Sequence, residues 1–184
     1  ELTEIWQKLH HYVDGMVPPS VRTQSTAPKA PKECTMLIND IFSLQDDDIL
    51  EALSTHLGEL SADGDCLNCL NKWERIVYFA DELCMEVNSG GLGNYLYYRG
   101  LHFEKAYGAL REISAFEAVA ILDSVREKFP KNRIPKTEER LQNTLDTLEE
   151  QGIDFETEDD LFYSSGEKDL LKCLLMYVKE NRNH

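Results

Sequence analysis

The sequence predicts an all-α fold, a single compact multi-helix domain with no significant β-sheet. Apolar residues recur at three- and four-residue spacing along most of the chain, and no segment combines the period-two alternation of a strand with a hairpin turn. The 184 residues, 42% hydrophobic and 29% charged, suffice for one core and have a globular composition. No segment approaches the roughly 18 consecutive apolar residues of a membrane span, and the first residues carry no basic n-region, so we expect a cytoplasmic protein.

Residues 1–33 are predicted to form an N-terminal helix followed by a linker. Apolar residues at helical spacing from Leu2 to Val13 indicate a short amphipathic helix. Between Val17 and Glu33, four prolines lie among serine, threonine and alanine, a composition typical of extended or irregular backbone. The main helical domain is therefore expected over residues 34–184.

Three segments lead from there to the middle of the chain. Residues 36–44 suit a helical turn, and apolar residues from Ile49 to Leu60 predict a helix whose start is marked by three aspartates. Residues 61–65 are a turn. The cleanest helical pattern of the sequence follows, with six apolar residues on one face: Leu70, Trp73, Val77, Ala80, Cys84 and Val87.

A glycine-rich elbow, residues 88–93, is expected to end that helix. Asn88 and three glycines allow a positive φ and can satisfy the last helical carbonyls. An aromatic run, residues 95–98, begins directly afterwards. The side chains of Glu86 and Asn88 are suited to pairing with backbone groups that a tight bend leaves free, so we interpret both as structural.

Two helices are predicted directly after the aromatic run. Residues 103–113 have apolar side chains at helical spacing. Ser114, with Glu117 three positions later, is a capping box that opens the next helix, which continues to Phe129. A basic, proline-bounded loop at 130–136 follows.

The last third of the chain is predicted to contain two more helices with an acidic loop between them. Thr137 caps the first helix and Gly152 ends it. The acids of residues 154–160 are expected in a loop that neighbouring aromatic side chains pin against the body. Residues 170–178 are expected to form a buried closing helix.

Negative charge is concentrated in two segments. The formal net charge is −15; residues 39–71 hold eight acids and no base, and residues 137–163 hold ten acids against Arg140 alone. Charge of this sign repels nucleic acid and anionic membranes, and a concentrated negative field speeds the encounter with a basic partner. The alternative interpretation is that the acids serve solubility.

The central segment also carries a family resemblance. Residues 86–91 read Glu-Val-Asn-Ser-Gly-Gly, and an aromatic segment, Gly100 and a helix of small residues beginning at Ile113 follow. This order resembles the core of a bacterial domain-of-unknown-function family typified by DNA mimic protein nineteen, over about residues 70–183. The positions that match the family core are Glu86, Val87, Asn88, Gly90, Gly91, Tyr95 and Gly100. Those that depart from it are Ser89, Leu92, Asn94, Leu96 and Tyr98.

The resemblance implies a non-enzymatic protein that mimics the charge of DNA. Its carboxylates would take the place of phosphates in the Lys/Arg groove of a basic DNA-binding partner, such as a transcription factor, and a homodimer would extend the charged surface. No cofactor, no metal, no direct nucleic-acid contact and no membrane contact are expected. The residues assigned to the partner-binding surface are Asp46, Asp47, Asp48, Glu51, Glu149, Glu150, Asp154, Glu156, Glu158, Asp159 and Asp160.

Two other functional classes stay open. A small-molecule or peptide-binding module, of the immunity type, could use the elbow and the adjacent Tyr95, Tyr97 and Tyr98 as a pocket. An uncharacterised enzyme would need a convergent group of His, Cys and Glu side chains. The chain has no Gly-x-Ser-x-Gly motif, and its glycines lack the lysine of a P-loop.

The five cysteines are expected to be reduced thiols. Their number is odd, and the chain is large enough not to need disulfides. Cys66 and Cys69 have the spacing of half a zinc site or a redox pair. However, no second pair lies at zinc-binding spacing and no βαβ pattern surrounds them, so we interpret both as incidental.

Overall fold

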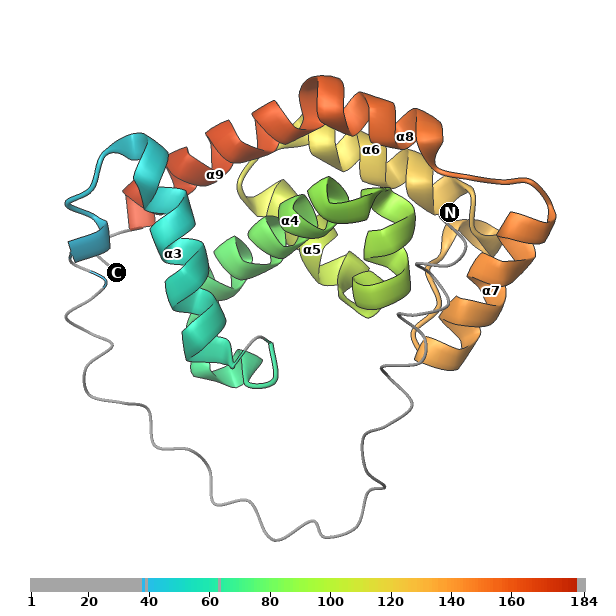
Figure 1. The fold of residues 1–184 in the computed structure, drawn as a ribbon, viewed down its shortest axis with the longest axis horizontal. Helices are drawn as coiled ribbons and strands as arrows, with labels where there is room; N and C mark the ends of the chain where they lie inside the picture. Colours follow the sequence, from blue (N-terminus) through green and yellow to red (C-terminus); the bar gives the residue numbers. More distant parts are fainter. Residues whose placement is uncertain (1–37, 39, 63, 182–184) are drawn as a thin grey trace, which may run out of the picture.

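The computed structural model describes residues 38, 40–62 and 64–181, and every regular element within them is a helix (Figure 1). The predicted all-α fold is confirmed. Residues 1–33 lie outside the described part, so their helix and linker stay predictions. The elements in chain order are α3 (Asp46–Ser61), η1 (Leu67–Cys69), α4 (Lys72–Arg99), η2 (Gly100–His102), α5 (Phe103–Glu112), α6 (Phe116–Glu127), η3 (Pro130–Asn132), α7 (Glu138–Glu150), α8 (Glu156–Leu161), the π-helical turn η4 (Phe162–Gly166) and α9 (Glu167–Asn181).

Among these helices none is both long enough and apolar enough to cross a membrane.

Helix α4 lies at the centre of the molecule and packs against α3, α5, α7, α8 and α9 (Figure 1). The apolar face predicted from Leu70 to Val87 is buried at all six positions. A capping box starts the helix, because the amide of Glu74 donates to Asn71 Oδ1 (3.1 Å) and the amide of Asn71 donates to Glu74 Oε2 (2.7 Å). Helix α4 is thus the element against which most of the other helices pack.

At the glycine elbow the first helical part of α4 ends and a second part begins in a new direction. Gly90 has extended φ (−169°), and Gly91 has φ +80°, the positive value expected of the elbow. Helical geometry then resumes and continues to Arg99. The prediction that the first helix ends at the glycine elbow is therefore confirmed. A second helix, which the sequence analysis does not predict, follows on a new axis and carries the aromatic run.

Helices α8 and α9, with η4 between them, follow one another without a break and form one long arm across the molecule (Figure 1). Of the acids expected in a loop at 154–160, Asp154 does lie in the loop, whereas Glu156, Glu158, Asp159 and Asp160 form the start of this arm. Phe155 and Phe162 are both buried and lie seven residues apart, so two helical turns bring both rings to the same side. Where the arm meets α6, a Cβ on Gly166 would lie 2.6 Å from Ile121 Cδ1, so the two elements approach closely at this glycine.

The predicted capping box of Ser114 and Glu117 does not form. Ala115 is the N-cap residue of α6, and its side chain makes no cap. The amide of Glu117 instead donates to Asp169 Oδ2 of α9 (2.9 Å), so a carboxylate from a distant helix satisfies the end of α6. At α7 the predicted positions of both ends are confirmed, because Thr137 is the N-cap residue and Gly152, with φ +71°, follows the last turn. The side chain of Thr137 makes no capping hydrogen bond, however.

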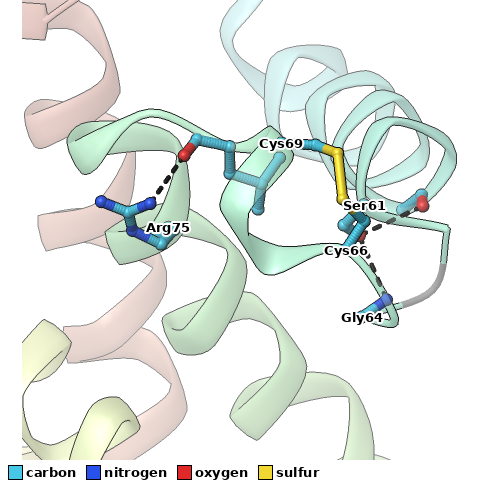
Figure 2. Close-up of a disulfide and its surroundings, with 7 residues drawn as sticks. Ser61, Gly64, Cys66, Cys69 and Arg75 are labelled. Carbon is cyan, nitrogen blue, oxygen red and sulfur yellow. Dashed lines mark hydrogen bonds between the residues drawn. A yellow bond between two sulfur atoms is a disulfide. The ribbon is translucent and has the colours of Figure 1, made fainter. Parts of the chain in front are cut away.

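Cys66 and Cys69 form a disulfide in the turn before α4, which corrects the prediction of two reduced thiols (Figure 2). The turn brings their Cα atoms to 5.5 Å, within the range that a disulfide needs. The amide of Cys66 donates to the Ser61 carbonyl (2.8 Å), and Arg75 Nη1 donates to the Leu70 carbonyl (2.8 Å). The turn is thus tied to both flanking helices.

Replacing both cysteines of this turn with serine should cost only modest stability. The Cys66→Ser/Cys69→Ser variant loses a cross-link that closes a very short loop, for which the chain-entropy contribution is about 1.5 kcal/mol. We expect the free energy of unfolding, measured by urea titration, to fall by about 1 to 2 kcal/mol while the circular dichroism of the helices is unchanged. An unchanged transition midpoint, in wild-type protein shown by mass analysis to be oxidised, would contradict this role for the disulfide.

Candidate functional site

The two acidic segments of the sequence lie at opposite ends of the molecule. Helix α3 carries the first at one end of the long axis, and α7 with α8 carries the second at the other end (Figure 1). Asp48 and Glu51 of α3 are exposed, whereas the side chains of Asp46 and Asp47 are outside what the structure describes. One copy of the chain therefore does not join all the predicted carboxylates into a single surface.

The second segment builds a charged patch that we call the acidic end. Three carboxylates of α7 occupy positions i, i+3 and i+4 and share one helix face, and two of α8 are related by i, i+4. Asp146, which the sequence assignment omitted, belongs to the first group. Its spacing from Glu149 and Glu150 was the signal that could have identified it. The acidic end comprises Asp146, Glu149, Glu150, Asp154, Glu156 and Asp160.

All six side chains of the acidic end belong to exposed residues. None of them is in an ion pair with any of the described basic residues. Their charges are therefore directed to solvent and are available to a partner.

Glu158 does not belong to this surface. It is only 3% exposed, it accepts a hydrogen bond from Ser124 Oγ (2.7 Å), and it forms an ion pair with Lys128 at the end of α6. Lys128 also donates to the Asp154 carbonyl (2.6 Å). Burial alone would raise the pKa of Glu158, but the hydrogen bonds from Lys128 and Ser124 outweigh it and hold the pKa below its usual value. Glu158 thus fastens the start of the arm to the end of α6.

Asp159 is also structural. Its Oδ1 accepts a hydrogen bond from the amide of Leu92 (2.7 Å), one of the backbone donors exposed where α4 restarts after the elbow. A Cβ on Gly91 would lie 2.6 Å from Asp159 Oδ2, so the carboxylate fits directly against the glycine. Burial and the charges of Glu158 and Asp160 raise the pKa of Asp159, in spite of the hydrogen bond from Leu92.

A second side chain of the arm completes the elbow. Tyr163 Oη donates to the Val87 carbonyl (2.8 Å), on the other side of the bend from Leu92. Asp159 and Tyr163 together pair with a backbone donor and a backbone acceptor that the elbow takes out of the regular helix ladder. Asp159 and Tyr163 thus take the role that the sequence analysis predicts for the side chains of Glu86 and Asn88, which is pairing with the backbone groups of the bend.

Glu86 and Asn88 pair with other side chains instead. Glu86 accepts hydrogen bonds from Arg99 Nε (3.3 Å) and Asn94 Nδ2 (3.4 Å), and Asn88 Nδ2 donates to Glu167 Oε1 (2.7 Å). The prediction of a structural role is consistent with these contacts, but the predicted backbone partners were wrong. The bend directs both side chains toward neighbouring elements rather than back onto its own backbone.

The remaining positions of the family core are packing positions. Val87 and Tyr95 are fully buried, and a Cβ on Gly100 would lie 2.6 Å from Leu141 Cδ2 of α7. The hydroxyl of Tyr95 has no hydrogen-bond partner among the described residues. Tyr97 and Tyr98, which were candidates for a pocket, are exposed and stack edge to face with ring centroids 4.9 Å apart.

A buried polar cluster centred on Glu82 was missed by the sequence analysis. Glu82 Oε1 accepts from Tyr78 Oη (3.1 Å), Oε2 lies 2.7 Å from His102 Nδ1, and Arg99 Nε lies 3.6 Å away. Burial alone would lower the pKa of Arg99, but the charge of Glu82 and the hydrogen bond to Glu86 raise it. Glu82 and Glu86 are one helical turn apart, and this spacing is the sequence pattern that could have predicted two acids on the same face of α4.

This cluster forms one wall of a cavity of about 370 Å³ between α3 and α4. Tyr78, Glu82, Glu86 and Arg99 line it from α4, and none of Tyr95, Tyr97 and Tyr98 does. The pocket that could serve a small-molecule or peptide ligand is thus built on the turns before the elbow and on Arg99 after it, not on the tyrosines.

Neither metal binding nor a cysteine nucleophile is indicated by the described residues. No group of three or more His, Cys, Asp or Glu side chains among them is placed to hold a metal ion. Burial, with the charges of Glu167 and Asp81, raises the pKa of the Cys84 thiol to about 12, so this free cysteine stays protonated at neutral pH.

Comparison with known proteins identifies a family. A family model described as DMP19-like protein matches residues 68–181, more than half of the chain, from η1 to the end of α9. The match supports the resemblance to the family of DNA mimic protein nineteen, without testing the individual residues of the Glu-Val-Asn-x-Gly-Gly core. No curated protein and no solved structure is significantly similar to the chain.

Glu158 and Glu156 should respond differently to loss of charge. Glu158→Gln leaves Lys128 without its carboxylate in a largely buried site, and we expect the free energy of unfolding to fall by about 1 to 3 kcal/mol. The exposed Glu156→Gln control should change it by no more than about 0.5 kcal/mol. Urea titration of the two variants measures the difference, and equal effects would place Glu158 on the surface after all.

The stabilising effect of Glu158 should also depend on pH. Because its pKa is lowered in the folded protein, its contribution is fully present above the ordinary Glu value of 4.5. It is lost as the pH falls from there through the lowered pKa. The gap in unfolding free energy between wild type and Glu158→Gln should therefore shrink under acidic conditions, which urea titrations over a pH series would detect.

Asp159 should show the opposite pH trend. Asp159→Ala removes the cap of Leu92 and should lower the free energy of unfolding by about 1 to 2 kcal/mol, whereas Asp159→Asn keeps an acceptor oxygen and should lower it less.

Because the pKa of Asp159 is raised on folding, the stability of wild type relative to Asp159→Asn should decline as the pH rises from the ordinary Asp value of 3.8 through the raised pKa. Thermal melts that show a pH-independent difference would overturn this assignment.

Proposed function

Because the chain belongs to the DMP19-like protein family, we propose that it is a non-enzymatic DNA mimic whose acidic end binds a basic DNA-binding protein, such as a transcription factor. The matched region, residues 68–181, contains both helices that supply the acidic end. The observation that carries the proposal is the group of six exposed carboxylates, without ion pairs to described bases, at one end of the molecule.

The spacing of these carboxylates suits a groove that accepts phosphates. Asp146 and Glu150 are separated by one helical turn, about 6 Å along the axis of α7. Phosphates of one DNA strand recur about every 3.4 Å along the duplex axis. One face of α7 thus presents charge at a comparable density, and α8 adds Glu156 and Asp160 at the same end.

The acids of α3 are left out of this footprint because they lie at the other end of the long axis. A homodimer, which the family resemblance implies, would let a second copy extend the charged surface. In that arrangement Asp48 and Glu51 of one copy could contribute only if the two-fold axis brings α3 near the acidic end of the other copy. The proposal therefore assigns the partner contact to the acidic end and leaves α3 outside it.

An alternative is a small-molecule or peptide-binding module. The cavity between α3 and α4 favours it, because a buried carboxylate, Glu82, and the guanidinium of Arg99 converge on its wall. A ligand there would be recognised by its polar groups and would be indifferent to charge reversal at the acidic end.

Charge reversal at the two ends of the molecule tests the proposal. Asp159 is left unchanged in this test, because reversing its charge would also remove the cap of Leu92. We choose Glu150→Lys/Asp160→Lys at the acidic end, and Asp48→Lys/Glu51→Lys on α3 as the matched control with the same change of charge. All four residues are exposed, so the fold should be retained.

The readout is capture of partners from the lysate of the native host at low salt, followed by a salt step and mass spectrometry. We expect wild type and the α3 variant to retain a DNA-binding protein that duplex DNA displaces. The acidic-end variant should bind it about tenfold or more weakly, because each reversal replaces an attraction by a repulsion. Retention that survives reversal at the acidic end, or that duplex DNA does not displace, would rule out mimicry by this surface.

A further inference from the structure

A positively charged groove interrupts the surface of this acidic protein. It lies between η1, the first turns of α4, and α5, and has a volume of about 590 Å³. Lys72, Arg75 and Lys105 line it, against the single acid Glu112. A local excess of positive charge is unexpected on a chain whose net charge is −15, and it points to an anionic occupant.

The floor of the groove is apolar. Phe79 and Ala109 are buried beneath it, and Leu67 and Ile76 add partly buried aliphatic surface. The cations lie next to this apolar base, at the rim of the groove. The ammonium of Lys105, for example, lies over the Phe79 ring, with Nζ 5.1 Å from the ring centre. The groove therefore combines an apolar base with charged walls, as sites for amphipathic ligands do.

The rim cations keep donors available for a ligand. Arg75 uses one of its five N–H groups for the Leu70 carbonyl (2.8 Å), on the edge of the disulfide turn (Figure 2). Lys72 is paired with Glu112 at 3.6 Å, but both side chains are largely exposed, so the pair is weak and can open. The disulfide between Cys66 and Cys69 holds Leu67 and Asn68 as one wall.

Gly108 is the second, independent observation. It lies inside α5, where glycine costs about 0.8 to 1 kcal/mol relative to alanine. A Cβ on Gly100 or Gly166 would lie 2.6 Å from a neighbour, but a Cβ on Gly108 would meet nothing within 4 Å, and Gly108 does not have positive φ. Neither backbone conformation nor close packing requires this glycine. Its position in the lining of the groove supplies a reason, since any side chain there would occupy the open volume.

We propose that this groove binds a small organic anion that joins an apolar body to a carboxylate, sulfonate or phosphate. The apolar body lies over Phe79 and Ala109 in the space that Gly108 leaves open, and the anionic group meets Arg75 and Lys105. The inference goes beyond DNA mimicry and shares no residue with the acidic end.

Binding of two amphipathic probes and of inorganic phosphate to the full chain tests the proposal. The probes are 8-anilinonaphthalene-1-sulfonate, an aromatic sulfonate, and dodecanoate, an acyl carboxylate; calorimetry measures affinity, and amide chemical shifts locate the site. We expect at least one probe to bind at one site and to shift the amides of Leu67, Lys105 and Ala109. The tighter probe distinguishes an aromatic from an acyl source of the ligand.

Three variants assign the binding to the groove. Gly108→Leu places a side chain in the groove from a Cβ position that meets no atom within 4 Å. It should weaken binding about tenfold or more, while thermal melts show an equal or higher midpoint. Lys105→Met removes one rim charge and should weaken binding about fivefold. Lys136→Met is the matched control, because it makes the same change of charge beside α7, outside this groove.

The outcomes are distinct. Specific probe binding that Gly108→Leu and Lys105→Met weaken, and that Lys136→Met leaves unchanged, supports the proposal. It is overturned if neither probe binds, if phosphate alone binds as tightly as the probes, or if Gly108→Leu binds them as wild type does. None of these results depends on partner capture at the acidic end, so failure of the DNA-mimic proposal would be seen separately.

Discussion

The hydrogen bond from the Leu92 amide to Asp159 is the contact on which the arrangement of this protein depends. The central helix must bend at Gly90 and Gly91, and the bend leaves backbone groups that water cannot reach freely. Asp159 and Tyr163 supply partners for them from 67 and 76 residues later in the chain, respectively. The bend and the arm therefore require each other: without the arm the elbow would hold unpaired groups, and without the elbow the arm would lose its anchor.

Because of this contact, the acidic residues of α8 do not all have the same role. Read linearly, Glu156, Glu158, Asp159 and Asp160 look equivalent, but a helix distributes them around its axis. Glu158 and Asp159 turn inward, toward Lys128 and Leu92, while Glu156 and Asp160 turn outward. Half of that cluster holds the fold together, and only the other half is available to a partner. The pKa values of these two adjacent residues shift in opposite directions. Burial acts to raise both, but hydrogen bonds from Lys128 and Ser124 lower the pKa of Glu158, whereas neighbouring carboxylates add to the rise in the pKa of Asp159.

The net charge of −15 likewise conceals an uneven distribution. Carboxylates gather at both ends of the long axis, whereas cations gather in a groove beside the disulfide turn. Electrostatic recognition depends on local fields within about 10 Å at 0.1 M salt, so each region acts on its own partner rather than through the total charge. A surface for a basic protein and a site for a small anion can therefore coexist on one domain.

The sequence by itself determined the features that repeat over a few residues. Periodicity predicted the all-α fold and the buried face of α4, and glycine chemistry predicted the positive φ at the elbow and the end of α7. Only the tertiary structure decided which distant groups meet: Asp159 with Leu92, Asp169 with the start of α6, Glu158 with Lys128, and Glu82 with His102. The Cys66–Cys69 spacing allowed either thiols or a disulfide, and the geometry of the turn selected the disulfide. The physical reason is that apolar periodicity reports burial along one helix, whereas capping, ion pairing and groove formation depend on how separate helices pack.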